Sequence, residues 1–399
     1  MKKVIKILCC VLTPIIIMCI LAYAKVKDIP NTVFVRQGEN GLKTSLFEFD
    51  RYKEVASIGE SKIKKVDISI LGILPVKSVS VKSVPRIKLN VGGQPIGIKL
   101  NTKGVLIVGF SDINTSNGKI PSPAAAEGVQ IGDSIIKVNG ENILDIQDLG
   151  NKINKAKDNK ISLTLERKGK YITKVITRVK SEDNNYKIGL WVRDSTAGVG
   201  TLTFYYSKTN QFGALGHPIT DVDTGTMLKV NSGNLLNSSI VSIRKGFKGT
   251  PGEIRGIFVN EDNPIGSVQN NTMCGIFGKG ASNVFSNKLN KQMEIGLRNE
   301  IKTGEAKILT TIDGDEPKLY SVYIEKLYPQ ESPGPKSMLI RVTDSELLKK
   351  TGGIVQGMSG SPIIQNNKIV GAVTHVLINK PDVGYGIYIE WMLKDAGIF

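Results

Sequence analysis

The sequence predicts a mainly β protein made of several domains, and its length and glycine usage carry this prediction. A chain of 399 residues is too long for one ordinary hydrophobic core, so two or three domains are expected. Many of its 42 glycines separate short runs of valine, isoleucine and leucine. This pattern is typical of strands joined by tight turns.

The N-terminal segment, residues 1–24, is basic and then apolar. Three lysines precede an uncharged run over residues 7–24, which is near the minimum length for a helix that crosses the hydrocarbon core. The basic flank favours a cytoplasmic N-terminus, so the rest of the chain would be exported. We therefore expect a transmembrane helix that associates the protein with the membrane. Because Ala22-Tyr23-Ala24 resembles a cleavage site, a removed signal peptide is the alternative.

Charge and cysteine usage exclude several classes of function. The formal net charge is +17, but the lysines are scattered and form no compact basic stripe with aromatic residues. Nucleic-acid binding is therefore not expected, whereas a basic surface beside anionic lipid is. Outside the N-terminal apolar run the only cysteine is Cys274, which we interpret as a buried small residue. With two histidines and no clustered cysteines, we expect neither a catalytic metal nor a cofactor.

Residues 25–91 and 92–182 are expected to form two separate units. The first alternates β-prone stretches with lysines and carries no chemical motif, so we interpret it as a β-rich segment beside the membrane. The second contains a short helix that ends at Gly128, a strand over 135–138, a tight turn at Asn139-Gly140, and then an amphipathic helix. This order closely resembles a PDZ domain of the kind found in exported proteases.

The PDZ resemblance implies a peptide-binding loop near the start of that unit. Four residues, Pro95, Ile96, Gly97 and Ile98, would offer backbone N–H groups to a peptide carboxylate. The adjacent strand edge would then accept the peptide as an added strand. The alternative is that the glycines of this segment only close turns.

The C-terminal region, residues 186–399, again consists of short apolar runs separated by glycine turns. Such a region fits a double antiparallel β-barrel, with a sandwich as the alternative. His217 lies here between Gly216 and Pro218, so a turn is expected to place it at the end of a strand. A general base needs both this exposure and a fixed ring. His375 lies inside an apolar strand and is interpreted as a core or wall residue.

The segment 357–362, Gly-Met-Ser-Gly-Ser-Pro, is the candidate nucleophile motif. A serine hydroxyl needs a base to take its proton, and the oxyanion that forms needs converging backbone N–H groups. The candidate donors are the N–H groups of Gly357 and Ser359. The motif resembles the Gly-x-Ser-Gly-x-Pro core of chymotrypsin-like proteases, and alignment on that core selects Ser359 over Ser361 as the nucleophile. The resemblance implies a chymotrypsin-like double β-barrel for this region.

A carboxylate is expected to orient the histidine. The residues alone leave three candidates: Asp221 and Asp223, which are close to His217 in sequence, and Asp344, which precedes the nucleophile motif.

Taken together, the N-terminal segment, the PDZ-like unit and the motifs around His217 and Ser359 resemble the SpoIVB sporulation peptidases of endospore-forming bacteria. The closing segment 384–393 adds to the resemblance. It implies a serine endopeptidase whose base, aspartate and nucleophile are His217, Asp344 and Ser359.

The same resemblance implies a role in sporulation. Such enzymes act at the forespore inner membrane, on the side that faces the intermembrane space. They cleave themselves and then a membrane-bound regulator of an intramembrane protease, which activates pro-sigma-K processing. The PDZ domain would govern self-cleavage and the choice of protein substrate. The alternative is a non-catalytic PDZ scaffold or adaptor in the cell or spore envelope.

Overall fold

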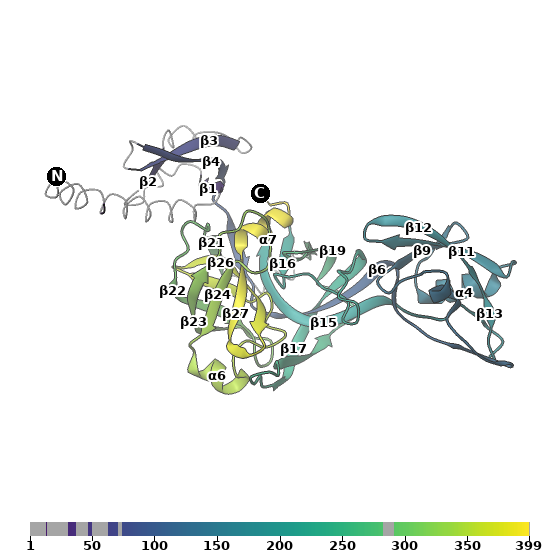
Figure 1. The fold of residues 1–399 in the computed structure, drawn as a ribbon. Helices are drawn as coiled ribbons and strands as arrows, with labels where there is room; N and C mark the ends of the chain where they lie inside the picture. The colour runs from purple at the N-terminus through teal and green to yellow at the C-terminus, as the bar shows by residue number, and fades with distance from the viewer. Residues whose placement is uncertain are drawn as a thin grey trace, which may run out of the picture.

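The computed structural model describes residues 13, 31–36, 47–49, 63–70, 74–281 and 291–398. The predicted membrane segment, residues 7–24, lies outside the described residues apart from Thr13. In the parts of the chain that are described, no helix combines the length and the apolar character needed to span a membrane. As expected, the described chain is mainly β (Figure 1).

The first described unit is a four-stranded sheet with strand order β1-β4-β3-β2. Its strands are β1 (Thr32–Arg36), β2 (Phe47–Phe49), β3 (Ile63–Ile70) and β4 (Leu74–Val84). Arg36 at the end of β1 donates a 2.8 Å hydrogen bond to Glu300 and another hydrogen bond to the backbone carbonyl of Ile295. The predicted β-rich segment therefore contacts the C-terminal region directly.

Strand pairing closes a first barrel that runs in the order β6-β15-β16-β20-β19-β17 and back to β6. Alternating apolar side chains fill it, among them Ile96, Leu202 and Leu235, and all three are buried. Its strands are β6 (Pro95–Phe110), β15 (Leu190–Tyr206), β16 (Gln211–Ala214), β17 (Val230–Arg244), β19 (Gly266–Thr272) and β20 (Gly275–Gly280). Strand β18 (Glu253–Val259) pairs with β17 in the antiparallel direction.

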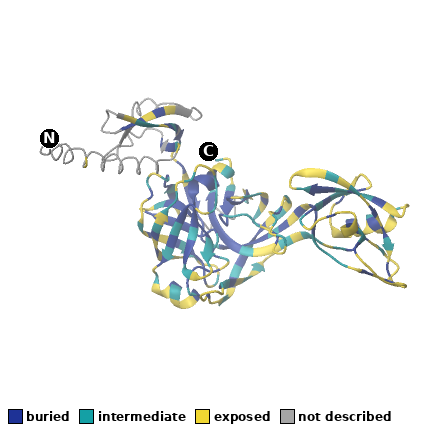
Figure 2. Cartoon of the chain, in the orientation of Figure 1, coloured by how far each residue is buried: buried dark blue, intermediate teal, exposed yellow. Residues whose placement is uncertain are grey.

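A second barrel closes in the order β22-β23-β24-β27-β26-β25 and back to β22. Its strands are β22 (Gly304–Thr310), β23 (Lys318–Leu327), β24 (Met338–Val342), β25 (Pro362–Gln365), β26 (Lys368–Leu377) and β27 (Lys380–Tyr388). Two short strands join the barrels, because β21 (Gln292–Ile295) pairs with both β26 and β5 (Lys88–Val91). The strands of the two barrels carry many of the buried residues, which are coloured dark blue in Figure 2. Of the two predicted architectures, the structure thus has the double barrel.

The PDZ-like unit lies at one end of the molecule and is joined to the first barrel by the two long strands β6 and β15 (Figure 1). These strands pair along almost their whole length, from Pro95 beside Thr201 to Phe110 beside Leu190. Between them the chain forms a separate apolar core. Its elements are β7 (Ile113–Thr115), β8 (Gly118–Ile120), α3 (Pro123–Ala126), β9 (Ser134–Val138), β10 (Glu141–Asn142), α4 (Ile146–Lys155), β11 (Lys160–Arg167), β12 (Lys170–Thr177), β13 (Val179–Lys180) and β14 (Tyr186–Lys187).

Local signals in the sequence explain the helices of this unit. Ser122 caps α3 by accepting a hydrogen bond from the Ala125 N–H, and Pro123 occupies the first turn, where its missing N–H costs nothing. Gly128 then adopts a left-handed conformation with φ +76° and ends the helix as predicted. Asp145 caps α4, which buries Leu149 and Ile153 against the core of the unit.

The predicted peptide-binding loop is corrected by the structure. Pro95, Ile96, Gly97 and Ile98 are not in a loop but in the barrel half of β6. Ile96, Gly97 and Ile98 pair with β15 on one side and with β17 on the other. Because ladder partners occupy both edges of the strand, these residues have no free edge to offer a peptide. The start of the predicted PDZ unit is therefore part of the first barrel.

Candidate active site

A sharp turn after β16 presents His217 at the junction of the two barrels. Leu215 and Gly216 both have left-handed backbones, with φ values of +67° and +71°. A Cβ on Gly216 would lie 3.0 Å from the Thr374 side chain, so glycine permits a close approach to β26. The His217 Nδ1 atom lies 2.8 Å from the Pro218 carbonyl oxygen. That contact suits an Nδ1–H donor, which leaves Nε2 as the basic nitrogen.

The environment of His217 lowers the pKa of its imidazole below the ordinary value. Burial is the main cause, because it disfavours the charged ring, while the hydrogen bond to Pro218 opposes it. The ring is therefore neutral near pH 7, as a general base must be.

Ser359 lies in the loop between α6 (Ser345–Thr351) and β25, and this loop is fastened to the first barrel. The Thr201 N–H donates to the Ser359 carbonyl at 3.0 Å, and Thr201 Oγ1 donates to the Gly357 carbonyl at 2.8 Å. Thr203 Oγ1 donates to the Gly360 carbonyl at 2.8 Å. Two strand residues of β15 thus fix the backbone on both sides of the serine.

The backbone around Ser359 leaves the expected oxyanion donors available. Gly357 has φ +100°, a conformation that glycine adopts without strain. The Met358 N–H donates to the Val355 carbonyl at 3.1 Å, whereas the N–H groups of Gly357 and Ser359 make no hydrogen bond within the described residues. Two unpaired donors two residues apart are the arrangement that an oxyanion requires.

Ser361, the alternative nucleophile, is fully buried. Its hydroxyl contacts the Thr310 hydroxyl at 2.8 Å and donates to the Met358 carbonyl at 2.7 Å. These two hydrogen bonds hold the loop in place from inside the second barrel.

His217 and Ser359 line one cleft of ≈ 650 Å³ between the barrels. The Ser359 hydroxyl forms no hydrogen bond with His217 but donates one of 2.7 Å to the Thr374 carbonyl. None of the residues that line the cleft is a lysine, arginine, aspartate or glutamate, and most of them are apolar, including Ile98, Val199 and Ile354. The structure therefore brings the expected base and nucleophile to the same apolar cleft.

Asp344 is not part of this cleft. It is the N-cap of α6, and its Oδ1 accepts the N–H groups of Glu346 and Leu347 at 3.0 and 3.1 Å. Its Oδ2 accepts the Ser321 N–H at 3.2 Å. Both carboxylate oxygens are therefore engaged with backbone donors away from His217, and the expected triad is not assembled.

The other two candidate carboxylates, Asp221 and Asp223, form ion pairs with Arg193. Asp221 is buried, forms an ion pair with Arg193, and accepts hydrogen bonds from Thr224, which together lower its pKa despite its burial. Asp223 pairs with the same guanidinium at 2.8 Å. These contacts shape the loop that follows His217 but do not reach its ring.

His375 is a site residue that the sequence did not reveal as such. It lies on β26 and lines the cleft, and its ring centroid is 4.8 Å from that of His217, with an angle of 41° between the planes. Burial is the main cause that lowers the pKa of His375 to about 4, with smaller contributions from His217 and Lys336. A core or wall position was predicted for His375, but its contact with His217 was not, because no local pattern encodes it.

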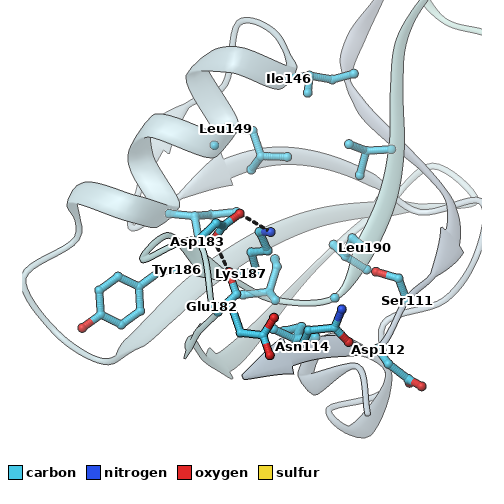
Figure 3. Close-up of a pocket in the computed structure, with 17 residues that line it drawn as sticks. Ser111, Asp112, Asn114, Ile146, Leu149, Glu182, Asp183, Tyr186, Lys187 and Leu190 are labelled. Carbon is cyan, nitrogen blue, oxygen red and sulfur yellow. Dashed lines mark hydrogen bonds and ion pairs between the residues drawn. The ribbon is translucent and has the colours of Figure 1, made fainter. Parts of the chain in front are cut away.

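A second cavity, of ≈ 440 Å³, lies in the PDZ-like unit (Figure 3). Ile146 and Leu149 of α4 form one wall, and the segment from Lys187 to Leu190 forms the opposite wall. Gly189 has φ +74°, and a Cβ there would lie 2.6 Å from the Ser111 carbonyl. The sequence signal that could have located this wall is Ile188-Gly189-Leu190 at the start of β15, rather than the similar run at residues 96–98.

Neither cavity offers a metal site. Among the described residues, no group of three or more histidine, cysteine or acidic side chains is placed to hold an ion.

Comparison with solved structures finds similarity to proteases. The active form of the Rv3671c protease from M. tuberculosis matches with 16% identity and a TM-score of 0.31, covering 51% of this chain and 75% of its own. The HtrA-type protease AlgW with a decapeptide matches with 11% identity and a TM-score of 0.28, covering 51% and 53%. No curated protein matches the chain.

Two family descriptions match the sequence itself. A PDZ domain matches residues 118–167, within the unit between β6 and β15. The SpoIVB peptidase S55 family matches residues 184–393, which include both His217 and Ser359 and amount to more than half of the chain. The chain therefore belongs to the SpoIVB peptidase S55 family of serine peptidases.

Proposed function

We propose that His217 and Ser359 are the base and the nucleophile of this serine peptidase, and that the Gly357 and Ser359 N–H groups bind the oxyanion. The observation that carries the proposal is that both side chains line the same cleft between the barrels, beside these two unpaired donors. The Pro218 carbonyl supports the same assignment, because it holds the His217 Nδ1 proton and leaves Nε2 free to accept another.

Catalysis begins when the Ser359 hydroxyl leaves the Thr374 carbonyl and turns toward His217. His217 Nε2 takes the hydroxyl proton as Oγ attacks the peptide carbonyl, and the carbonyl oxygen becomes an oxyanion. The C–N bond then breaks, and the imidazolium returns that proton to the leaving amine. Water adds to the acyl-enzyme through the same base, which releases the carboxylic acid and restores Ser359.

The walls of the cleft favour an uncharged, apolar substrate segment. An extended peptide would place side chains against Ile98, Val199 and Ile354 without meeting a charged partner. A lysine or carboxylate in this cleft would lose its hydration without compensation, which is costly. The surface charge of the protein therefore does not set the selectivity of its cleft.

We further propose that this peptidase acts on the extracytoplasmic face of the membrane during sporulation. The family membership supports this, as does the basic and apolar N-terminal segment, residues 1–24. In this proposal the enzyme is held at the forespore inner membrane, cleaves itself, and then cleaves a membrane-bound regulator of an intramembrane protease. That cleavage would signal pro-sigma-K processing. The cavity of the PDZ-like unit would hold a peptide segment of the substrate and so contribute to the selection of substrates.

The test compares the full-length wild type with Ser359→Ala and His217→Ala. A fluorophosphonate probe should label the wild type, and the chain should be clipped during expression. Both variants should lose labelling and clipping while keeping the melting temperature of the wild type. If Ser359→Ala is clipped at the wild-type rate, self-cleavage through Ser359 is wrong. If the folded wild type neither labels nor cleaves, the protein is a scaffold.

A further inference from the structure

We propose that the hairpin tip between β17 and β18, residues 245–250, docks on an anionic lipid surface and holds the cleft between the barrels beside the membrane. The docking itself does not depend on catalysis. Its consequence, that the enzyme cleaves bonds close to the lipid headgroups, rests on the proposed roles of His217 and Ser359. The tip is far along the chain from the N-terminal segment, residues 1–24, so it would orient a protein that this segment holds at the membrane.

Phe247 is an exposed aromatic residue at this tip. It is 61% exposed and is the only largely exposed phenylalanine among the described residues. Lys245 and Lys248 flank it in sequence and are exposed as well. Aromatic rings suit the boundary between headgroups and acyl chains, and nearby ammonium groups are attracted to anionic lipid. The tip thus combines the two side-chain types that a membrane surface binds.

Backbone hydrogen bonds hold the tip in one conformation. Phe247 and Thr250 exchange two bonds of 2.9 Å, which close a tight turn. The Gly246 N–H donates to the carbonyl of residue 351 in α6 at 2.8 Å, and the Gly249 N–H donates to the Ile378 carbonyl at 3.0 Å. The tip is therefore fastened to α6 and to the second barrel. Because the ring is presented by a fixed turn, docking would cost little conformational entropy.

The charge at the tip is positive and largely uncompensated. Arg244 and Arg255 share one carboxylate, that of Glu253, at 3.5 Å each. Their side chains are 51% and 62% exposed. Lys245 and Lys248 have no ion-pair partner within the described part of the chain. One carboxylate thus faces four cationic side chains, and this surface is complementary in charge to anionic lipid.

The tip adjoins the mouth of the cleft between the barrels. Pro251, the residue that follows the tip, lines the cleft, and so does Ile378, which accepts the hydrogen bond from Gly249. Ile378 is 54% exposed, so the rim of the cleft is also apolar at this point. A membrane in contact with Phe247 would therefore lie beside the entrance to the cleft.

The shape of the tip favours lipid over an acidic protein segment. None of the residues from 245 to 250 lines the cleft or the cavity of the PDZ-like unit. A bound peptide needs a groove or a strand edge to fix its register. A lipid surface needs only positive charge and an exposed apolar side chain, and the tip supplies both.

The experiment measures how deeply the tip enters a bilayer. Full-length Ser359→Ala chain, with Phe247→Trp added, is reconstituted into vesicles of brominated phosphatidylcholine with or without phosphatidylglycerol. Brominated acyl chains quench a tryptophan that reaches them. Quenching beyond that of Ser359→Ala alone should appear in the anionic vesicles and should be lost in about 1 M salt, where screening is strong. Tyr171→Trp is the matched control, because Tyr171 is 60% exposed on β12, and it should add no quenching.

Reversal of charge at the tip tests its electrostatic part. Lys245→Glu with Lys248→Glu, added to Phe247→Trp, should lower the ratio of docked to undocked protein by at least about 25-fold, about fivefold for each lysine. Lys160→Glu with Lys170→Glu changes the net charge equally at two exposed positions of the PDZ-like unit and should leave the quenching unchanged.

Three results would overturn the proposal. The first is quenching at Phe247→Trp that does not exceed that at Tyr171→Trp, and the second is equal quenching in neutral and anionic vesicles. The third is a Lys245→Glu, Lys248→Glu variant with a serine at position 359 that docks normally but cleaves itself slowly in detergent without lipid, which would assign the tip to an acidic protein segment. Failure of the wild type to react with a fluorophosphonate would overturn the role of Ser359 but would leave the quenching test intact.

Discussion

Gly360 shows how single residues set the geometry beside the proposed nucleophile. Its φ of +97° is a left-handed conformation that side chains with a Cβ rarely adopt. A Cβ at this position would lie 2.1 Å from the Thr201 carbonyl oxygen and 2.5 Å from the Leu215 N atom. Both neighbours are backbone atoms, so neither can move aside without displacing β15 or the turn before His217.

Gly360→Ala should therefore abolish labelling of Ser359 by a fluorophosphonate probe. The change should also lower the free energy of unfolding by more than about 1–2 kcal/mol, the cost of the backbone conformation alone. Thermal denaturation and labelling measure the two effects. Gly118→Ala is the matched control, because Gly118 has φ +108° but a Cβ there would meet nothing within 4 Å. Equal losses of stability in both variants would show that the overlap with Thr201 is unimportant.

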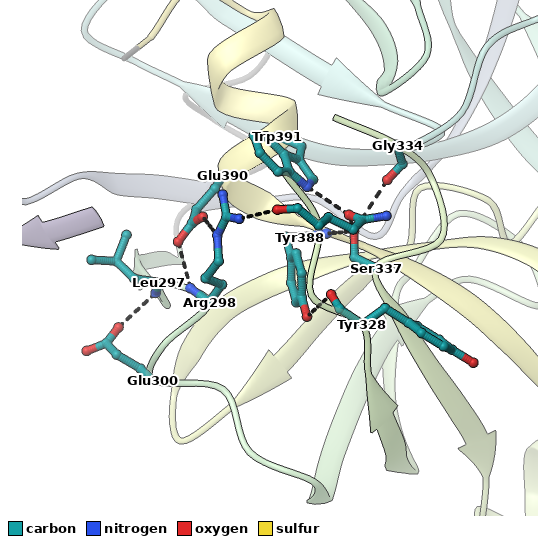
Figure 4. A network of polar contacts seen from close by, with 10 residues as sticks. Leu297, Arg298, Glu300, Tyr328, Gly334, Ser337, Tyr388, Glu390 and Trp391 are labelled. Atoms are coloured by element: carbon teal, nitrogen blue, oxygen red, sulfur yellow. Dashed lines mark hydrogen bonds and ion pairs between the residues drawn. The ribbon is translucent and has the colours of Figure 1, made fainter. Parts of the chain in front are cut away.

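At the scale of single elements, α7 (Ile389–Asp395) illustrates how the end of the chain is fixed (Figure 4). Glu390 is fully buried and accepts hydrogen bonds from the backbone N–H and Nε of Arg298, both at 2.6 Å. The guanidinium lies 4.3 Å from the Trp391 ring and donates to the Gln330 carbonyl. Burial raises the pKa of Glu390, while Arg298 opposes this, so the carboxylate depends on its partner.

Arg298→Ala should destabilise the protein by about 3–5 kcal/mol, because it removes the guanidinium and leaves the buried Glu390 carboxylate without a compensating positive charge. Urea denaturation followed by tryptophan fluorescence measures this loss. Adding Glu390→Gln to Arg298→Ala should recover part of it, since a neutral amide is less costly to bury than a charge. If the double variant is no more stable than Arg298→Ala, the unpaired charge is not the cause.

At the scale of the whole molecule, the elements that local patterns specify were predictable. Turn glycines and short apolar runs indicated a mainly β chain, and the short helix after Ser122 stops at Gly128, where the sequence indicated. The motifs also located His217 and Ser359, because their flanking glycines mark the turns that present them. These signals act over a few residues, so they can be interpreted without knowledge of how distant strands pair.

Long-range placement was not predictable in the same way. Residues 96–98 and 188–190 are both apolar-Gly-apolar runs, and only the pairing of β6 with β15 and β17 shows that the first run is inside a barrel. The contact of His375 with His217 joins two barrels and has no sequence pattern. Asp344 precedes the proposed nucleophile in sequence, but it caps α6 and does not line the cleft.

Strand β15 contributes to both the cavity of the PDZ-like unit and the cleft that contains His217 and Ser359. Leu190 and Val192 at its start line the cavity of the PDZ-like unit, and its residues 196–199 line the cleft between the barrels. Arg193 lies between these stretches and pairs with Asp221 and Asp223, next to residues that also line the cleft. The pairing of β15 with β6 shifts register on both sides of Val192-Arg193. These irregularities bend β15 between the PDZ cavity and the cleft. One strand therefore links the wall of the first cavity to the wall of the cleft.

Ile146→Lys should slow self-cleavage of the full-length chain more than it slows fluorophosphonate labelling of Ser359. Ile146 is partly exposed at the start of α4 and lines the PDZ cavity, so a lysine there would obstruct an apolar peptide segment. The small probe reaches Ser359 without that cavity. Leu144→Lys is the matched control, because Leu144 is 75% exposed nearby and does not line the cavity. Gel analysis of fragments over time measures self-cleavage, and equal rates for the two lysine variants would argue against a substrate-holding cavity.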